Sequence, residues 1–323
     1  MSSSDLMTID NAIAARSGRS FDQNPALVYL AALGSEHSRR AMRGALDTIA
    51  GMIYPDGNLG ALTFPWEVLR YQHTSAIRSQ LQASHYKPSS ANLFLAALRG
   101  VLKECWQLGL MTAEDYHRAI AVKAVRGETL PAGRELTAGE IDALFRVCNE
   151  DHTPAGRRDG AILAVLRYGL RRAEVVTLEL NDFDPDKGGL RIMGKGKKER
   201  AVYLPDSAAE YVRRWLAVRG TDAGALFVAI NKGGNIRGYS GLSSQAIYDM
   251  LKKRAGQAGV KDFSPHDFRR TFAGDSLQAG ADIAIVSKLM GHASIETTAK
   301  YDRRPDDAKR KAAALIHVPA PGQ

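Results

Sequence analysis

Apolar residues recur every three or four positions along most of the chain, which is the period of amphipathic helices. In the first third, this pattern predicts helices over residues 25–33, 38–52, 64–70, 74–83 and 89–108. Residues 1–24 lack the pattern, and we interpret them as a flexible lead-in. We therefore expect a helical first domain over residues 25–124.

The stretch VKAVRGETLPAGR, residues 122–134, mixes glycine, proline and charge without an apolar period, as linkers do. We place a linker at 125–135 and a second domain at 136–318. Thr137 and Glu140 form a capping-box pattern for a helix to residue 147, and Gly169 ends a helix over 155–168. A short helix over 173–178 and a helix over 243–256 are also predicted, with a loop at 231–241.

Two short runs with strand character, residues 190–193 and 199–204, flank the segment Gly-Lys-Gly-Lys-Lys at 194–198. Such a segment between two strands predicts a β-hairpin with lysines at its tip. The predicted fold class is therefore mainly α with a small β-sheet, in a two-domain arrangement.

The C-terminal stretch from Ser264 to Tyr301 concentrates the candidate chemistry. Ser264 and Asp267 predict a capped helix that starts at Pro265 and ends at Gly280. His266 and Arg269 then share one helical face near the N-terminal end, where the helix dipole and unpaired backbone N–H groups favour an anion. A second helix is predicted over 282–291, a short one from 294 to 301, and a last one after Pro305.

Composition and charge narrow the class of protein. A chain of 323 residues with 45% apolar composition favours two domains and excludes disorder throughout. The net charge of +9 points toward a polyanionic partner. Residues 1–130 hold 13 lysines and arginines against 11 acids, whereas the remainder holds 31 against 24, so the second part is the more basic.

Two cysteines, Cys105 and Cys148, lie far apart in apolar helical context, which predicts reduced thiols rather than a disulfide. No zinc-ligand spacing or carboxylate cluster occurs, so we expect neither a metal nor another cofactor. No apolar run is long enough to span a bilayer, and no export signal is seen. We expect a soluble, cytoplasmic, nucleoid-associated protein.

Five motifs follow one another in the second part: GLRRAE at 169–174, GKGKKER at 194–200, HDFR at 266–269, GH at 291–292, and Tyr301 nine residues later. In this order and spacing, they resemble the catalytic domain of tyrosine recombinases, the phage-integrase and Xer-like family. The resemblance covers about residues 136–318, and the helical first part is similar in kind to that family's core-binding domain. It implies two domains that clamp duplex DNA.

The resemblance also implies a role for each matching residue. Tyr301 resembles the nucleophile, and Arg171 and Arg269 resemble the two arginines that grip the scissile phosphate. Lys195 resembles the general acid that protonates the leaving 5′-oxygen. The other matching positions are His266, His292, where the family has His or Trp, and the supporting acid Glu174. The departures, Arg270 where the family often has His and Asp302 after the tyrosine, fall where no chemistry is expected.

Physical chemistry supports this set independently of the family. A phosphodiester repels nucleophiles, and the extra negative charge of its transition state must be stabilised. Two guanidinium groups suit this task because their donor forks bind pairs of phosphate oxygens and stay charged. A tyrosine becomes a nucleophile when a neighbouring histidine accepts or orients its proton.

The resemblance implies a partner and an assembly as well: double-stranded DNA with an inverted-repeat core site, a dimer per site and a tetramer on two sites, with possible accessory DNA-bending proteins. The segment after Pro305 is expected to dock on a neighbouring protomer, or else on its own domain. Lys195, Lys197, Lys198 and Lys252 are candidate phosphate contacts. Arg39, Arg40 and Arg43 form a weaker candidate basic face in the first domain.

Each candidate also has an ordinary structural explanation, such as a surface arginine, a turn lysine or a half-buried tyrosine. Their order in one chain favours the catalytic interpretation: a site-specific recombinase acting through a 3′-phosphotyrosyl intermediate in integration, excision or resolution. Two alternatives stay open. One is a type IB topoisomerase, which shares the chemistry but needs no defined site, and the other is a non-catalytic DNA-binding protein on a recombinase scaffold.

Overall fold

The computed structural model describes residues 21–55, 59–127, 133–194, 199–292 and 294–302. Over its full length the chain divides into two compact units, Met1–Pro131 and Ala132–Gln323. Each unit has its own hydrophobic core. The predicted helix after Pro305 and the tip of the predicted hairpin at 195–198 lie outside the described residues.

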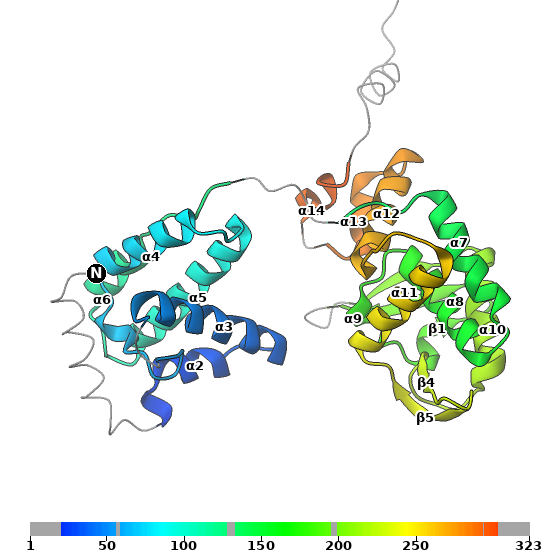
Figure 1. Ribbon diagram of the computed structural model, residues 1–323, viewed down its shortest axis with the longest axis horizontal. Helices are drawn as coiled ribbons and strands as arrows, with labels where there is room; N and C mark the ends of the chain where they lie inside the picture. The colour runs from blue at the N-terminus through cyan, green and yellow to red at the C-terminus, as the bar shows by residue number, and fades with distance from the viewer. Residues whose placement is uncertain (1–20, 56–58, 128–132, 195–198, 293, 303–323) are drawn as a thin grey trace, which may run out of the picture. The chain divides into compact units, whose positions relative to one another are not determined.

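The first unit is helical (Figure 1). Its elements are the 3-10 turns η1 (Phe21–Gln23) and η2 (Trp66–Val68) and the helices α2 (Pro25–Ala31), α3 (Glu36–Ile53), α4 (Tyr71–Ala83), α5 (Pro88–Gln107) and α6 (Ala113–Ile120). Helix α5 contacts all four other helices. Its buried face holds Leu95, Leu98 and Leu102, spaced by three and four residues as the apolar period requires.

The helix predicted over 64–70 is wrong in extent, because only the η2 turn forms there. The apolar residues of this stretch are buried all the same. The Trp66 indole donates a hydrogen bond to Ala61 O at 2.8 Å, and the ring lies 4.7 Å from that of Phe64. A compact loop therefore fills the core where a helix was predicted.

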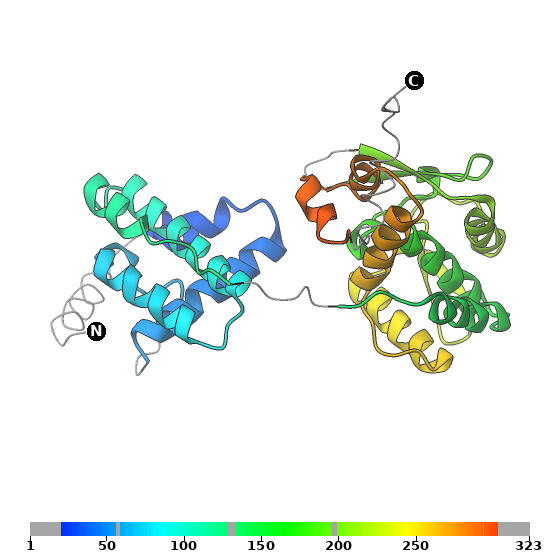
Figure 2. The ribbon, with the colours of Figure 1, turned by 90° about the horizontal axis from the view of Figure 1, so that it is seen from above.

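The second unit combines helices with two small antiparallel sheets (Figures 1 and 2). Its helices are α7 (Ala138–Glu150), α8 (Pro154–Arg167), α9 (Arg172–Val175), α10 (Asp206–Arg219), α11 (Ser244–Ala258), α12 (Pro265–Gln278), α13 (Ile283–Met290) and α14 (Ile295–Ala299). The other elements are η3 (Leu180–Asp182), β1 (Phe183–Asp184), β2 (Gly189–Met193), β3 (Glu199–Tyr203), β4 (Val228–Ile230) and β5 (Ile236–Gly241).

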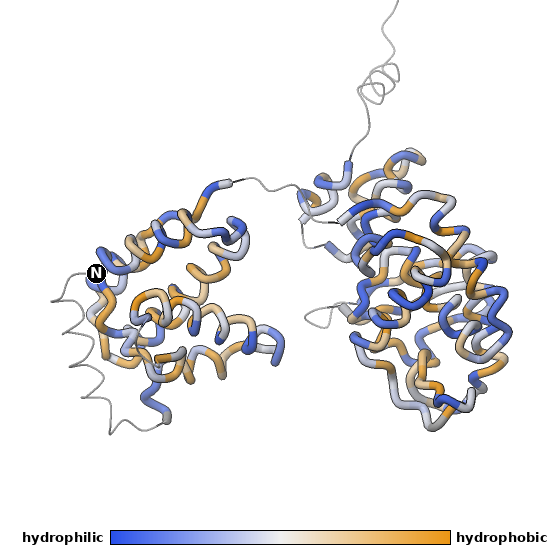
Figure 3. Tube along the Cα trace, viewed as in Figure 1, coloured by the Kyte–Doolittle hydropathy of each residue, from blue (hydrophilic) through white to orange (hydrophobic). Residues whose placement is uncertain are grey.

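Helix α8 is the centre of this unit. All six residues from Ala161 to Leu166 are buried, because α7, α10 and α12 pack around the helix. The Trp215 indole of α10 donates to Leu226 O at 2.7 Å, which ties α10 to the chain before β4. Figure 3 shows apolar and polar stretches alternating along the surrounding helices. The C-terminal end of α8 is thereby held rigidly where the chain turns at Gly169.

The predicted hairpin is confirmed: β2 pairs with β3 in register, with Ile192 opposite Arg200, and β1 adds a third strand. The loop predicted at 231–241 is confirmed over 231–235 but wrong over 236–241, because β5 occupies Ile236–Gly241 and pairs with β4. The strand was not predicted because its sequence has glycines at 238 and 241 and few apolar residues, which are not typical of a strand. Helix α10 was not predicted at all, and α9 is shorter than the helix predicted over 173–178.

The capped helices of the C-terminal stretch are confirmed. The Asp267 carboxylate accepts from both the Ser264 backbone N–H at 2.8 Å and the Ser264 hydroxyl at 2.9 Å. Asp282 and Ser294 cap α13 and α14. These helices enclose a small core of their own, formed by Phe272, Ala273, Leu277, Val286, Met290 and Tyr301. Cys105 and Cys148 are both buried free thiols, and none of the helices in the described part of the chain could cross a membrane.

Helix α11 carries the adjacent basic residues Lys252, Lys253 and Arg254, and the Arg254 side chain is only 1% exposed. Its guanidinium donates to Asp159 Oδ2 at 2.9 Å and to Asp151 Oδ2 at 2.7 Å. Asp159 is itself buried. The arginine therefore joins α11 to α8 and to the end of α7.

We expect Arg254→Ala to lower the free energy of unfolding of the second unit by about 3–5 kcal/mol, because it leaves the buried Asp159 carboxylate short of a partner. Urea denaturation measures the change. The matched control is Arg214→Ala, which removes an exposed pair with Glu210 and is expected to cost about 0.5 kcal/mol or less. Equal losses in the two variants would contradict the prediction.

Candidate active site

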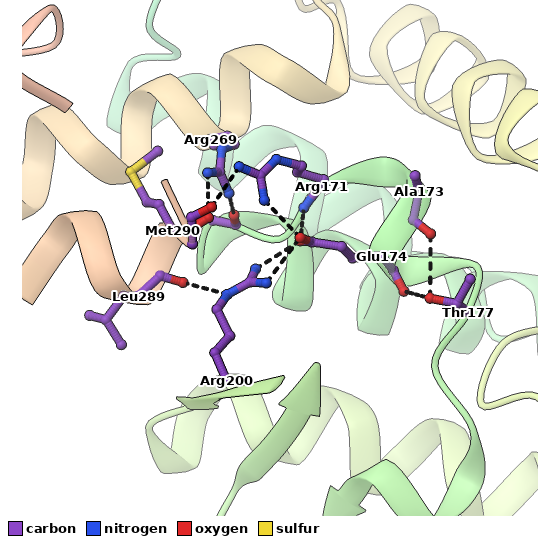
Figure 4. Close-up of polar contacts among 10 residues, drawn as sticks. Arg171, Ala173, Glu174, Thr177, Arg200, Arg269, Leu289 and Met290 are labelled. Carbon is purple, nitrogen blue, oxygen red and sulfur yellow. Dashed lines mark hydrogen bonds and ion pairs between the residues drawn. The ribbon is translucent and has the colours of Figure 1, made fainter. Parts of the chain in front are cut away.

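Arg171 lies in the turn between α8 and α9. Gly169 makes this turn possible with a positive φ of 81°, and a Cβ there would lie 2.7 Å from the Phe272 ring. The Arg171 backbone N–H donates to Glu174 Oε2 at 2.7 Å, and its Nη1 donates to Glu174 Oε1 at 2.8 Å. Its Nη2 donates to Gly291 O at 3.0 Å, which places Arg171 against the end of α13 (Figure 4).

Arg200, near the start of β3, approaches the same carboxylate from the other side. Its Nη1 and Nη2 donate to the two oxygens of Glu174 at 2.9 and 2.8 Å, and its Nε donates to Leu289 O at 2.9 Å. Glu174 thus holds two arginines, one from each side (Figure 4). The Glu174 side chain is 7% exposed, so this is a buried ion cluster.

Arg269 lies on the inner face of α12, at 1% exposure. It donates to Gly169 O through Nη1 and to Met290 O through Nη2. Its Nε has no hydrogen-bond partner among the described residues. The two carbonyls orient the guanidinium between the α8–α9 turn and the end of α13, beside Arg171 (Figure 4).

Tyr301 follows α14 and is 9% exposed. Its hydroxyl lies 3.2 Å from His266 Nε2, within hydrogen-bond distance. The Arg270 guanidinium lies over its ring at 5.6 Å from the centroid, which is cation–π distance. Two residues of α12 therefore contact the tyrosine, one at its hydroxyl and one over its ring.

His292 follows Gly291, whose left-handed conformation ends α13. Its Nδ1 lies 2.8 Å from the Thr298 hydroxyl, and its ring stacks with Tyr301 at 6.3 Å between centroids. Thr298 is fully buried in α14. This contact joins the histidine to the helix that precedes the tyrosine.

The arginines shift the protonation equilibria of the two histidines. Burial lowers the pKa of His292 to about 4, and Arg269 and Arg171 add to the shift. Burial, with Arg269 and Arg270, also lowers the pKa of His266. Burial opposes ionisation of Glu174, but hydrogen bonds from Arg200 and Arg171 outweigh it, so the pKa of Glu174 is lowered. Burial and Arg171 lower the pKa of Arg269 to about 9, which leaves it charged at neutral pH. The site therefore combines charged arginines with neutral histidines.

We expect the second unit to lose stability as the pH falls from about 6.5 toward about 4. Above pH 6.5 His292 is neutral in the folded and unfolded states, whereas in this window only the unfolded state binds the proton. Urea denaturation of the wild type at pH 7 and pH 5 measures the loss. His292→Gln should reduce this pH dependence, and His37→Gln, at an exposed position of α3, should not; equal pH dependence in all three would contradict the assignment.

The structure brings together most of the residues that the sequence predicted for the site. Arg171 binds Glu174, and Arg171 and Arg269 donate to the neighbouring carbonyls of Gly291 and Met290. His266 lies within hydrogen-bond distance of Tyr301, and His292 stacks on the ring of that tyrosine. Lys195, Lys197 and Lys198 lie outside the described residues. Within the described part of the chain, no group of His, Cys, Asp or Glu residues could hold a metal ion.

The candidate DNA-binding residues that the structure describes, Arg39, Arg40, Arg43 and Lys252, have polar or ionic partners within the protein. Arg40 pairs with Glu36 at 2.7 Å, and Arg39 donates to Leu33 O at 2.8 Å. Arg43 approaches Asp47 only to 4.0 Å. These arginines are exposed on α3, whereas Lys252 pairs with Asp262 beside the Tyr248 ring.

Sequence reasoning missed three residues of the site, Arg200, Arg270 and Thr298. Arg200 is the last residue of the GKGKKER motif. Predicting the pairing register of the hairpin could have shown which face of the sheet Arg200 lies on. Arg270 was noted only as a departure from the family pattern, although its guanidinium covers the tyrosine ring. Thr298 carried no signal in the sequence.

The chain is similar in sequence to a known family and to known proteins. The model of the phage integrase family matches residues 134–307. The chain is 30% identical to the tyrosine recombinase XerC of Proteus mirabilis over 243 residues, which cover 73% of this chain and 75% of the relative. It is 34% identical to the tyrosine recombinase XerD of Neisseria meningitidis serogroup B over 173 residues, which cover 51% of this chain and 57% of the relative.

Two solved structures share the fold. The XerH site-specific recombinase bound to a palindromic difH substrate is similar with a TM-score of 0.65 at 19% identity, covering 97% of this chain and 89% of that one. The Tn1549 transposon integrase in complex with transposon right end DNA has a TM-score of 0.66 at 15% identity, covering 92% and 99%. The mainly helical fold class with small sheets is thus confirmed.

Proposed function

The chain belongs to the phage integrase family of tyrosine recombinases, and on this premise we propose that it cleaves and rejoins DNA at specific sites with Tyr301 as its nucleophile. The observation that carries the assignment is the 3.2 Å contact between the Tyr301 hydroxyl and His266 Nε2. It lies beside two arginines, Arg171 and Arg269, that a phosphate can share.

The cleavage step exchanges one phosphate ester for another. The Tyr301 oxygen attacks phosphorus, its proton passes toward His266 Nε2, and the bond from phosphorus to the 5′-oxygen breaks. The low pKa of His266 suits this role, because a neutral imidazole can accept the proton. The product is a 3′-phosphotyrosyl bond and a free 5′-hydroxyl.

Arg171 and Arg269 stabilise the negative charge that develops on the non-bridging oxygens. Their guanidinium groups are held by carbonyls and by Glu174, so little reorganisation is needed during reaction. The Arg171 side chain is 40% exposed, whereas Arg269 is 1% exposed. Arg171 is therefore the more accessible of the two arginines to an incoming phosphate.

The leaving 5′-oxygen needs a proton, and we assign this role to Lys195 of the hairpin between β2 and β3. His292, with its pKa of about 4, acts as a neutral hydrogen-bonding group beside the phosphate. Attack by a 5′-hydroxyl of another strand reverses the first step and rejoins DNA. The phosphate ester bond is conserved throughout, so the exchange is close to balanced in free energy.

The DNA partner follows from the family, and the details of the assembly are part of the proposal. The similar XerH recombinase is described on a palindromic substrate, which supports an inverted-repeat site for this chain. We further propose that two protomers bind each site and four assemble on two sites. Accessory DNA-bending proteins and association with the nucleoid are also part of the proposal. Lys197, Lys198, Lys252, Arg39, Arg40 and Arg43 are assigned to phosphate contacts.

Covalent capture tests the proposed function. The protein is mixed with nicked duplexes made from the DNA that flanks its own gene, the mixture is denatured, and any DNA that stays attached is sequenced. Adducts at one inverted-repeat site would support a site-specific recombinase. Scattered adducts would favour a topoisomerase, and salt-sensitive binding without adducts would favour the non-catalytic DNA-binding protein.

A further inference from the structure

Three consecutive carbonyls at the end of α13 accept hydrogen bonds from three different arginines. Arg200 donates to Leu289 O, Arg269 to Met290 O and Arg171 to Gly291 O. The last carbonyls of a helix have no partner within it and carry the negative end of its dipole. The arginines satisfy these groups and are held in place by them (Figure 4).

Arg171 and Arg200 both bind Glu174, but the Arg171 side chain donates to one oxygen of the carboxylate and the Arg200 side chain to both. The Arg200 side chain is 12% exposed, against 40% for Arg171. Arg200 therefore neutralises the negative charge of Glu174. The positive charge of Arg171 then remains available to a phosphate that binds next to it. Two arginines share one carboxylate, which leaves a net positive charge for the phosphate.

We propose that Arg200 is a positioning residue of this site: by binding Glu174 and Leu289 O together, it sets the place and the free charge of Arg171. This inference rests on the proposed function. Without Arg200, the buried carboxylate has Arg171 as its remaining ionic partner and draws that guanidinium away from the phosphate. A shift of about 1 Å in such a group can cost about 100-fold in rate.

Lysine cannot replace Arg200 in this arrangement. The guanidinium uses three nitrogens in a rigid fork, two on the carboxylate and one on the carbonyl. An ammonium is a compact point charge without that geometry. Arg200→Lys therefore keeps the charge and most of the side-chain stem while removing the link between Glu174 and α13.

Gly291 offers a second approach to the same contact. Its φ is 61°, and a Cβ there would lie 3.2 Å from Arg200 Cδ and Nη1. Gly291→Ala therefore crowds the Arg200 side chain, while residue 200 itself remains arginine. We expect this substitution to give the same kind of defect as Arg200→Lys, from the opposite side of the contact.

The test measures the single-turnover rate of adduct formation and the Kd on the duplex recovered by covalent capture, for wild type, Arg200→Lys, Gly291→Ala and Arg191→Lys. Arg191 is the matched control, because it lies on β2 of the same hairpin and pairs with Asp182 at 61% exposure. We expect Arg200→Lys and Gly291→Ala to lose about 100-fold in rate with Kd within about threefold, and Arg191→Lys to stay within about twofold.

A second substrate distinguishes a defect in stabilising the phosphate from a defect in protonating the leaving 5′-oxygen. Sulfur in place of the bridging 5′-oxygen gives a thiolate leaving group that needs no general acid. On this duplex Lys195→Ala should recover, whereas Arg200→Lys should stay slow because its defect lies at Arg171. Recovery of Arg200→Lys would mean that it acts through the hairpin lysine and would overturn the proposal.

Pairing with Glu174 gives a further readout. If Arg200 acts through Glu174, the double variant Arg200→Lys with Glu174→Gln should be no slower than the slower single variant. Fully multiplied losses, or a wild-type rate in Arg200→Lys, would overturn the proposal. An inactive wild type would instead refute the proposed function, so the two failures are distinguishable.

Discussion

Replacing Tyr301 with phenylalanine is expected to abolish covalent attachment of the protein to DNA. The substitution removes only the oxygen that attacks phosphorus, so no 3′-phosphotyrosyl bond can form. The ring keeps its place in the small core with Phe272 and Met290 and beneath Arg270, so folding and DNA affinity should be close to wild type. Denaturing electrophoresis of labelled duplex measures the adduct, and a binding titration at fixed salt measures the affinity.

Tyr203→Phe is the matched control, because it removes the same atom from an exposed tyrosine of β3. This control should form adducts at the wild-type rate. An adduct that persists in Tyr301→Phe would assign the nucleophile to another residue. Loss of DNA affinity together with the adduct would mean that the tyrosine serves binding rather than chemistry.

Replacing Arg269 with alanine is expected to slow adduct formation by about 10³-fold, the scale for losing a preorganised donor to a developing oxyanion. The reason lies in its position: its guanidinium is oriented by two carbonyls, and Nε has no partner among the described residues. The single-turnover rate at saturating protein measures the loss. The Kd should change far less, because phosphate contacts across the duplex supply most of the affinity.

Arg269 is buried, so the variant must first be shown to fold by its melting temperature and circular dichroism. The matched control is Arg167→Ala, which removes an arginine of α8 that pairs with Asp275 of the same helix α12. We expect the control to cleave at nearly the wild-type rate. Equal slowing in both variants would show that Arg269 supports the helix rather than the reaction.

Local signals in the sequence predicted much of the second unit. The capping pairs at Thr137 with Glu140 and at Ser264 with Asp267 form as expected, because a cap depends only on residues three apart. Gly169 and Gly291 end helices α8 and α13 for an equally local reason, their positive φ. The candidate residues on these turns and caps were therefore found without any knowledge of the fold.

Other predictions failed where packing decided the outcome. The stretch over 64–70 has a helical apolar pattern, but burying Trp66 and Phe64 in the core favoured an irregular loop. The strand at 236–241 forms because β4 pairs with it, although its own sequence resembles a loop. Arg254 directly follows two lysines in the sequence, and only the tertiary structure pairs it with the buried Asp159 carboxylate of α8.

The sequence by itself determined the family, the mainly helical class and the order of the candidate catalytic residues, because motifs and caps are properties of neighbouring positions. Only the tertiary structure decided which groups share the charge of Glu174 and which cap the end of α13. Arg200 is 26 residues from Glu174 and 89 from Leu289 along the chain, so no local pattern records either contact. The three arginines meet at the end of α13 because separate elements pack around this helix end, where unpaired carbonyls require donors.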